Sequence, residues 1–216
     1  MDTPFVDAEP TIFVVDEDPI LLCAAKAIGS RMAFHIEHCP SGEDLLTTCD
    51  PTQPGCILLD PAAPNCDGLA LLDQIIIEKD IPLPVVVVSE CREIPMVVEA
   101  MRRGALDYVL KPCDDERLSE VIGKALQWDS ANRRSLVQAA KVRRRLRDLN
   151  EGENEVLSRM VGGLSNRQTA EELKVSVRTV EDRRAKVMKK LHARSIAELV
   201  HLLATAHFVR RTGKMA

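Results

Sequence analysis

Short aliphatic runs alternate with longer amphipathic segments in roughly the first 127 residues of the chain. Five runs are rich in β-branched or aliphatic residues and are predicted to be strands: 11–15, 33–37, 56–59, 85–88 and 106–110. Between them, apolar residues recur every three to four positions, which is typical of helices. Helices are predicted at 19–30, from 41, from 67, at 95–103 and from 114. Continuous apolar strands that alternate with helices predict a five-stranded, parallel, doubly wound α/β domain.

The rest of the chain has only helical patterns. Residues 116–150 contain no proline and one glycine, which predicts a continuous linker helix of about 30 residues, roughly 45 Å long. A helix over 154–161 follows. Ser165 and Gln168 then form a capping box, and Ser176 caps another helix after a tight turn. This is a helix-turn-helix arrangement, whose second helix enters the major groove of DNA.

The pattern divides the chain into an α/β domain at 1–127, a helical linker at 128–148 and a small all-α domain at 149–216. Charge follows nearly the same division. Residues 1–128 contain 23 Asp and Glu against 9 Lys and Arg, a net charge of −14, whereas residues 129–216 contain 10 against 20, a net charge of +10. The basic part indicates a polyanionic partner, and the acidic part indicates a different task.

The cysteines and the apolar runs indicate the compartment. All seven cysteines lie in the acidic part, and their odd number without C-x-x-C spacing favours neither a disulfide framework nor a zinc site. Reduced thiols fit a cytosolic protein. The N-terminus lacks the pattern of a leader peptide, and no apolar run has membrane length. We therefore expect a soluble, cytoplasmic chain.

Polar residues follow the predicted strands directly at five positions. They are Asp16, Glu17, Asp60, Ser89 and Lys111. The carboxyl ends of parallel strands meet at one edge of a sheet, where such folds bind ligands. A single acidic residue after a strand is usually a loop or cap residue, but this ordered set is far more specific. Three carboxylates, a hydroxyl and an amine predict a pocket that handles a metal ion and a phosphoryl group.

Each of these residues has a predicted role. Asp60, at the end of the central strand, is the candidate nucleophile, since a carboxylate can form an aspartyl-phosphate. Asp16, Glu17 and Asp60 offer oxygen ligands to a small hard cation, for which Mg²⁺ is the candidate. Lys111 can pair with a phosphoryl oxygen, and Ser89 can donate a hydrogen bond to it.

Four segments resemble a response-regulator receiver domain: 14–18, 58–68, 88–89 and 105–112. The resemblance implies phosphotransfer from a sensor histidine kinase to Asp60, with Ala62 among the positions at the metal ion. It also implies that Ser89 and Tyr108 form a switch pair that moves when phosphate arrives. The alternative for Tyr108 is a core ring with its hydroxyl at the surface. We expect a homodimer in the active form. Phosphorylation would either expose a dimer surface around 94–127 or free a recognition helix that is masked in the resting form.

Three residues depart from the receiver pattern. Glu17 stands where the family usually has Asp, and Pro61 follows the acceptor directly, which removes a backbone N–H and restricts Asp60. Glu90 follows Ser89, where the family prefers Ala or Gly, and a carboxylate there should repel phosphate unless it points away. The hypothesis is that Asp60 is phosphorylated slowly, or that the receiver works partly without phosphate.

Three cysteines, Cys66, Cys91 and Cys113, fall in loops on the predicted active face. One interpretation is a thiol sensor, because a nearby lysine can lower the pKa of a thiol. The other is small buried side chains that fill space.

The basic part resembles the DNA-binding domain of the LuxR/FixJ family in the segments 149–157, 163–168, 177–184, 190–191 and 198–200. The family's usual lysine after Thr-Val is Glu181 here, and its histidine is Arg183. Glu181 and Asp182 cannot serve phosphates, but either could accept a hydrogen bond from a cytosine amino group. Together with Arg178 and Ala185 they are candidates for base reading. The rest of the predicted DNA interface, in which the basic residues are candidates for phosphate contacts, comprises Arg167, Lys174, Thr179, Arg183, Lys186 and Lys189.

These features predict a two-component response regulator that regulates transcription through duplex DNA and has at most slow self-dephosphorylation as an activity. One alternative is a DNA-binding regulator that works without phosphorylation. A second is an aspartyl-phosphate phosphohydrolase, but such enzymes commonly place an Asp two residues after the nucleophile, where this chain has Ala62. A third is a helical protein–protein module with a basic face.

Overall fold

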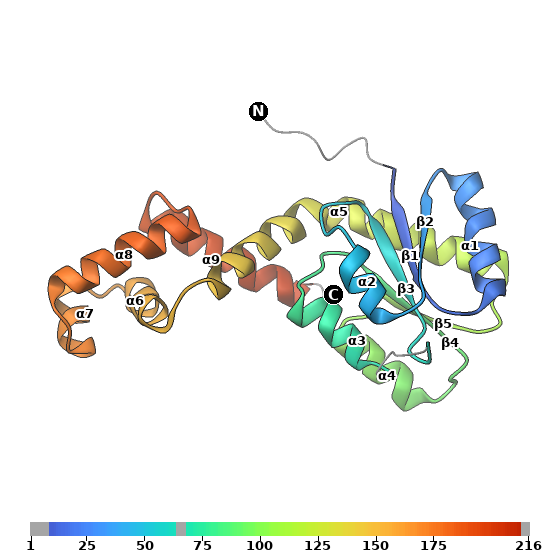
Figure 1. Ribbon diagram of the computed structural model, residues 1–216, viewed down its shortest axis with the longest axis horizontal. Helices are drawn as coiled ribbons and strands as arrows, with labels where there is room; N and C mark the ends of the chain where they lie inside the picture. The colour runs from blue at the N-terminus through green and yellow to red at the C-terminus, as the bar shows by residue number, and fades with distance from the viewer. Residues whose placement is uncertain (1–8, 64–67, 213–216) are drawn as a thin grey trace. The chain divides into compact units, whose positions relative to one another are not determined.

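The computed structural model describes the backbone of residues 9–63 and 68–212, and the side chains of these residues as far as Ala206 (Figure 1). The chain forms two compact units, Met1–Val137 and Gln138–Ala216. Within the described residues, no helix combines the length and the apolar character needed to span a membrane.

The first unit is built on a sheet of five parallel strands in the order β2-β1-β3-β4-β5. The strands are β1 (Thr11–Val15), β2 (His35–Cys39), β3 (Gly55–Leu59), β4 (Val85–Ser89) and β5 (Asp107–Leu110). The helices are α1 (Pro19–Met32), α2 (Gly42–Thr48), α3 (Ala70–Asp73) with its π-helical continuation η1 (Gln74–Glu78), α4 (Ile94–Arg103) and α5 (Asp115–Arg147). The predicted five-stranded parallel α/β fold is confirmed.

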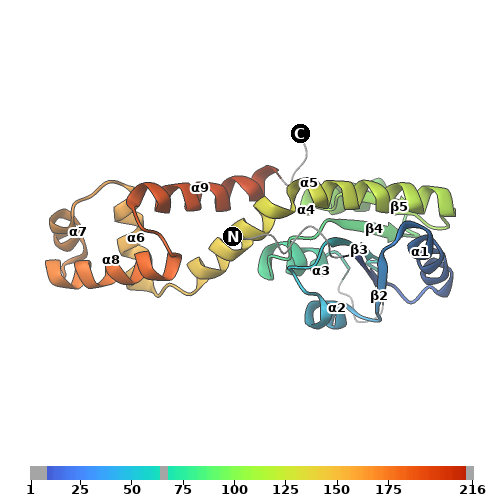
Figure 2. The same ribbon diagram turned by 90° about the horizontal axis from the view of Figure 1, so that it is seen from above.

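Helices cover both faces of the sheet (Figures 1 and 2), and alternate residues of each strand belong to the two cores between the sheet and these helices. In β1, Phe13 and Val15 belong to the core shared with α2, α3 and α4. Ile12 and Val14 belong to the core shared with α1 and α5. Because both faces of the sheet are covered, the central strands β1, β3 and β4 are buried along their whole length and are largely apolar, whereas the edge strand β2 is partly exposed and carries polar residues.

The strand order reverses at β1, since β2 lies on one side of β1 and β3 on the other. Open α/β sheets bind ligands outside the carboxyl ends of the strands at such a reversal. β1 and β3 pair in register from Thr11 with Gly55 to Val15 with Leu59. The next residues along the two strands, Asp16 and Asp60, therefore lie side by side at the reversal.

One predicted strand begins later than expected, because the helix before it ends differently. The strand predicted at 33–37 is β2, His35–Cys39. Ala33 instead ends α1 in the left-handed conformation, with φ of 55°, and its N–H donates to the carbonyl oxygen of Gly29. The predicted helix cap at Asp67 lies outside the described residues, and α3 begins at Ala70.

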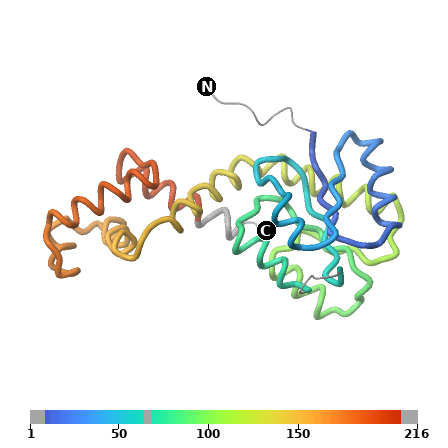
Figure 3. Tube along the Cα trace, in the orientation of Figure 1, coloured from blue at the N-terminus to red at the C-terminus, as the bar shows by residue number. Residues whose placement is uncertain are grey.

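The second unit is helical (Figure 3). After the end of α5 it contains α6 (Glu151–Val161), α7 (Asn166–Leu173), α8 (Val177–Leu191) and α9 (Ile196–Thr212). A capping box of Asn150 and Glu153 starts α6 earlier than the predicted residue 154. Ser165 and Gln168 cap α7, and Ser176 caps α8, as predicted. The four helices share a core that includes Val156, Ala170, Val180, Leu191 and Leu199.

The long helix α5 runs without a break over 33 residues. It begins in the first unit, where Leu118, Ile122 and Ala125 pack against the sheet, and it ends in the second unit at Arg147. The predicted continuous linker helix is therefore confirmed.

Candidate functional site

Four of the predicted pocket residues come together at the carboxyl ends of the strands. Asp16 follows β1, Asp60 follows β3, Ser89 ends β4 and Lys111 follows β5. These four side chains are buried, with residue exposures between 3% and 9%. Buried charges are stable only when they are paired and hydrogen-bonded, so the contacts among them decide what the pocket can do.

Lys111 joins the two buried carboxylates. Its Nζ lies 2.6 Å from Asp60 Oδ2, to which it donates a hydrogen bond, and 2.6 Å from Asp16 Oδ2. The other oxygens accept from loop amides: Asp60 Oδ1 from the N–H of Ala62, and Asp16 Oδ1 from the N–H of Asp18, both at 2.8 Å. Burial works against the charge on Lys111, but the two carboxylates outweigh it and hold the pKa of Lys111 above its usual value.

The carboxylates fit a divalent cation. The contact of Lys111 with Asp16 Oδ2 is an ion pair without the alignment of a hydrogen bond, and this buried oxygen accepts no hydrogen bond among the described residues. An oxygen of this kind beside a second carboxylate suits Mg²⁺, which commonly uses one or two carboxylates and keeps several waters. The Glu17 side chain is exposed. The described residues hold no group of three or more His, Cys, Asp and Glu side chains arranged for a metal.

Ala62 and Pro61 lie in a tight turn after β3. The N–H of Ala63 donates to the carbonyl oxygen of Asp60 at 3.1 Å, so Pro61 occupies the second position of a β-turn, which favours proline. The N–H that proline lacks is not needed at that position. Ala62 has no polar side-chain atom, so it can serve a cation only through its backbone.

The two residues of the predicted switch pair hold the same loop. The Oγ of Ser89 accepts from the N–H of Cys91 at 3.2 Å, and the Tyr108 hydroxyl donates to the carbonyl oxygen of Cys91 at 2.9 Å. Tyr108 is half-buried and packs against the core of the sheet. A movement of Ser89 can therefore be passed to Tyr108 through the backbone of Cys91. Glu90, between Ser89 and Cys91, is exposed.

Two of the three cysteines on the predicted active face can be placed in the structure. Cys91 and Cys113 are both half-buried, and Cys66 lies outside the described residues. Burial raises the pKa of the Cys113 thiol, and Lys111 offsets that only in part. A raised pKa lowers the thiolate fraction, which makes Cys113 less reactive than a sensor thiol needs to be.

A second candidate site is the outward face of α8. Arg178, Glu181, Asp182, Ala185, Lys186 and Lys189 are exposed, as are Arg167 and Lys174 nearby in the chain. Thr179 differs, because its hydroxyl lies 2.8 Å from that of Ser176 in the helix cap. The face thus carries an acidic pair between basic residues.

Arg183 also differs from the other predicted DNA contacts. It is half-buried, and its Nη1 lies 3.9 Å from Glu155 of α6. A Cβ at Gly152 would come within 2.6 Å of Arg183 Cζ. The guanidinium therefore packs on α6 over a glycine, instead of projecting with the exposed stripe.

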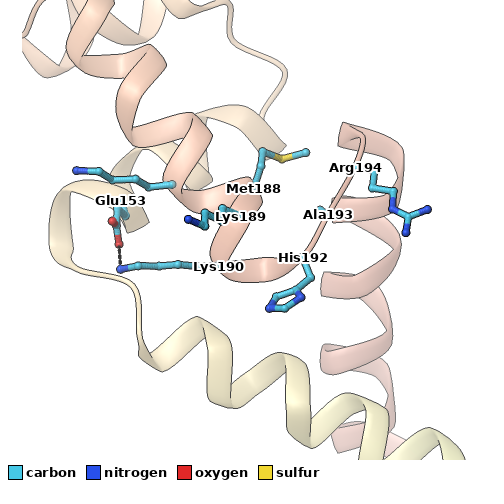
Figure 4. A pocket seen from close by; sticks show the side chains of 8 residues that line it. Glu153, Met188, Lys189, Lys190, His192, Ala193 and Arg194 are labelled. Carbon is cyan, nitrogen blue, oxygen red and sulfur yellow. Dashed lines mark hydrogen bonds and ion pairs between the residues drawn. The ribbon is translucent and has the colours of Figure 1, made fainter.

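The carboxyl end of α8 lines a basic pocket of about 940 Å³ (Figure 4). Its lining residues with polar side chains are Glu153, Lys186, Lys189, Lys190, His192 and Arg194. Lys190 donates to Glu153 at 2.6 Å, and this bond, with one from the N–H of Asn150, lowers the pKa of Glu153. Lys190, His192 and Arg194 are not among the residues predicted to contact DNA, although they lie close together in a basic stretch of the sequence.

Comparison with known proteins covers both units. Residues 12–123 match the family model of the response regulator receiver domain, and residues 148–203 match that of the bacterial regulatory proteins of the luxR family. The transcriptional regulatory protein FixJ of Rhizobium meliloti is 32% identical over 92% of this chain and 97% of its own length. The tetrathionate response regulatory protein TtrR of Salmonella typhimurium is 32% identical over 88% of this chain and 90% of its own length.

Solved structures agree with these matches. The response regulator StyR is 32% identical, with a TM-score of 0.54, and the match covers 91% of this chain and 98% of that one. Full-length FixJ from B. japonicum is 29% identical, with a TM-score of 0.50, over 94% of this chain and 99% of that one.

The two domains together settle the class of protein. Receiver domains generally use Mg²⁺ at the phosphorylation site, and a receiver joined to a helix-turn-helix domain implies a sensor kinase and DNA as partners. A regulator of this kind is not an ordinary enzyme. The chain belongs to the FixJ-type response regulators of two-component systems, and it is a transcription factor controlled by phosphorylation.

Proposed function

We propose that a sensor histidine kinase phosphorylates this regulator on Asp60 in the cytoplasm, and that the phosphoryl group changes how the second unit binds duplex DNA. One observation carries the proposal: Lys111 Nζ lies 2.6 Å from both Asp16 and Asp60, and all three side chains are buried at the strand tips. A cytoplasmic location is supported by the described cysteines, all of which are free.

The transfer exchanges one bond to phosphorus for another. A carboxylate oxygen of Asp60 forms the new P–O bond as the P–N bond to the kinase's histidine breaks, and the imidazole leaves with the electron pair and carries a proton. Asp16 and Asp60, with Glu17 and the backbone at Ala62 nearby, would hold Mg²⁺, which would offset the charge of the phosphoryl oxygens. Lys111 pairs with one of those oxygens.

The switch begins at Ser89. Its Oγ, which accepts from the N–H of Cys91, donates a hydrogen bond to the phosphoryl group. Cys91 then loses one of its two contacts, and Tyr108, which donates to the carbonyl oxygen of Cys91, changes position with the loop.

We assign homodimerisation of the active form to a surface on α4 and β5. Ile94, Val98 and Met101 of α4 and Leu110 of β5 are large apolar residues that are exposed. Apolar side chains gathered on one face mark interaction surfaces, and these four lie within residues 94–127. A dimer brings two copies of α8 to paired half-sites on DNA.

The exposed stripe of α8 supports the assignment of DNA contacts. Arg178, Glu181, Asp182 and Ala185 read base edges. The predicted phosphate contacts are Arg167, Lys174, Lys186 and Lys189. The basic pocket at the carboxyl end of α8 adds Lys190, His192 and Arg194 to this set. Thr179 holds the start of the helix, and Arg183 reaches DNA only if it leaves Gly152.

A regulator of this family whose receiver works partly without phosphate is the second candidate. It is favoured by the two exposed carboxylates beside the pocket, Glu17 and Glu90. Glu17 adds negative charge without joining the buried pair, and both residues should slow the approach of a phosphoryl donor. The tight turn at Pro61 gives this candidate no support, since proline fits its position there.

Self-dephosphorylation of Asp60 should be slow. A water molecule that attacks the phosphoryl group needs a base to accept its proton. Ala62 offers no carboxylate at the position where aspartyl-phosphate phosphohydrolases commonly have one.

The test uses the full chain with Mg²⁺ and beryllofluoride, which imitates a phosphoryl group on a carboxylate. We expect the affinity for an operator duplex to change about tenfold or more, and Asp60→Asn to abolish both this response and phosphoryl uptake from a kinase. Asp115→Asn, which changes an exposed carboxylate at the start of α5, is the matched control and should respond normally. Equal phosphoryl uptake by Asp60→Asn would contradict the assignment. Uptake without any change in DNA affinity would favour the second candidate.

A further inference from the structure

A second buried network of charges lies in α5, away from the strand-tip pocket. Asp129 is 1% exposed and Arg133 is 6% exposed. They are one helical turn apart, and Arg133 Nη1 donates to both carboxylate oxygens of Asp129, at 3.0 and 3.1 Å. The proposed phosphorylation site does not include either residue.

The other partners of this pair are backbone groups of one short segment, 51–55. The N–H of Gly55 donates to Asp129 Oδ2 at 3.1 Å. Arg133 Nη2 donates to the carbonyl oxygens of Pro51, at 3.3 Å, and Gln53. Gly55 is the first residue of β3, and a Cβ there would lie 1.8 Å from the carbonyl oxygen of Thr11. The segment is thus held tightly where it enters the sheet.

A buried ion pair is seldom more stable than apolar residues of the same size, because both charges lose their hydration. Its hydrogen bonds instead fix the relative positions of the groups that they join. Here the network is also incomplete. Arg133 Nε is buried without a hydrogen-bond partner in the described structure, and burial keeps the pKa of Asp129 raised even though Arg133 and Gly55 lower it. An unsatisfied network of this kind positions a helix and can also be released.

The network connects the proposed site of phosphorylation to the linker by a short route. It meets β3 at Gly55, and β3 ends at Leu59, directly before Asp60. On the other side, α5 continues from Arg133 to Arg147, beyond the boundary of the first unit. No other pair of buried side chains of opposite charge in the described part of α5 holds the backbone that leads into a strand.

We propose that Asp129 and Arg133 are positioning residues of the phosphorylation switch. They fasten the linker helix to the start of the strand that carries Asp60, so that the state of the pocket governs how the helix leading to the DNA-binding unit is held. This inference rests on the proposed function, because it concerns the response to phosphorylation at Asp60.

The experiment compares full-length variants with the wild type in two measurements: DNA affinity with and without Mg²⁺ and beryllofluoride, and backbone hydrogen exchange. The main variant, Asp129→Leu with Arg133→Met, replaces both charges with apolar side chains and leaves no unpaired ion. Asp129→Asn keeps the shape of the side chain, but it leaves Arg133 buried without its ion pair and is therefore the more destabilising change. Arg134→Met, one position along on the exposed face, replaces an arginine in the same way outside the network.

We expect the wild type and Arg134→Met to change DNA affinity about tenfold or more with beryllofluoride. The double variant should still bind beryllofluoride, because no residue of the pocket is altered, but its DNA affinity should change less than about twofold. In this variant, the amides of Thr52, Gln53 and Gly55 and those in 129–137 should each exchange at the same rate with and without the analogue. Asp129→Asn should also give a reduced response. If neither variant folds, the wild type decides the question: its amides in 129–137 should change their exchange rates with the analogue, and unchanged rates there would overturn the inference.

The outcomes are distinguishable. A lower melting temperature with an undiminished response to beryllofluoride would mean that the pair is only structural, and would overturn the inference while leaving the proposed function intact. No response in the wild type would overturn the proposed function and the inference together.

Discussion

The strand-tip pocket and the face of α8 are both rich in charge, but they hold their charges in opposite surroundings. In the pocket, Asp16, Asp60 and Lys111 are buried, and Lys111 lies 2.6 Å from each of the two carboxylates. On α8, Arg178, Glu181 and Lys189 are exposed. The pocket makes its contacts in the free protein, whereas the helix face can make its contacts only with a partner.

This difference follows from the environment of each charge. Buried pairs are little screened, and removal of one partner leaves an uncompensated charge. Exposed pairs contribute little in water because solvent and salt screen them. Substitutions in buried networks should therefore change the folded protein itself, and substitutions on the face of α8 should change binding and little else.

The largest expected effect comes from a comparison of two neighbouring arginines of α5, one buried and one exposed. Arg133→Met leaves Asp129 buried without its ion pair, so it should lower the free energy of unfolding by about 3–5 kcal/mol. Arg134→Met, on the exposed side, should change it by less than about 0.5 kcal/mol. Urea unfolding of the two variants measures both values. Equal losses of unfolding free energy in the two variants would show that burial does not make Arg133 more important for stability than Arg134.

The next effect concerns base recognition by the exposed acidic pair. Glu181→Gln keeps an acceptor but adds a donor and removes a negative charge, so it should weaken the preference for cytosine at one operator position by about 1–3 kcal/mol. Its affinity for non-specific DNA should rise slightly. Selection of bound duplexes from a randomised pool measures the preference, and the melting temperature should not change. An unaltered preference would remove Glu181 from the set of base-reading residues.

A smaller effect is expected for a single phosphate contact. Lys189→Ala should weaken binding to every duplex by a similar factor and should lower the slope of log K against log salt concentration by about one. Lys124→Ala is the control, because Lys124 is an exposed lysine in the first unit and pairs with Glu120. It should leave the slope unchanged. Filter binding at several salt concentrations measures the slope, and an unchanged slope for Lys189→Ala would place that lysine away from the phosphates.

The smallest expected effect is a difference in pH dependence between the two units. Burial raises the pKa of Asp129 above its usual 3.8, so its contribution to stability falls as pH rises from that value through the raised one. Hydrogen bonds from Lys190 and the N–H of Asn150 lower the pKa of Glu153 below its usual 4.5, so its contribution is present above that value and is lost as pH falls. Unfolding of Asp129→Asn and Glu153→Gln against pH should show opposite changes of slope; changes of the same sign would contradict one of these shifts.

Much of the fold can be predicted from the sequence. The apolar runs predicted all five strands, and Ser165 and Ser176 predicted the caps of α7 and α8. Those features depend on near neighbours in the chain. The start of β2 was misplaced because Ala33, which has no sequence signal for a left-handed turn, ends α1 in that conformation. The cap of α6 at Asn150 was missed, although Asn150 and Glu153 have the spacing of a capping box.

The order of residues along the chain determined which side chains could meet at the strand tips, because parallel strands bring their ends to one edge. Tertiary structure decided the rest. Only folding showed that Lys111 contacts Asp16 and Asp60 while Glu17 stays exposed, and that Arg183 packs over Gly152. Only folding buried Asp129 and Arg133 against the segment that enters β3. The physical reason is distance: helical and strand periodicity express contacts within a few residues, whereas Arg133 and Pro51 lie 82 residues apart and meet only when α5 packs on the sheet.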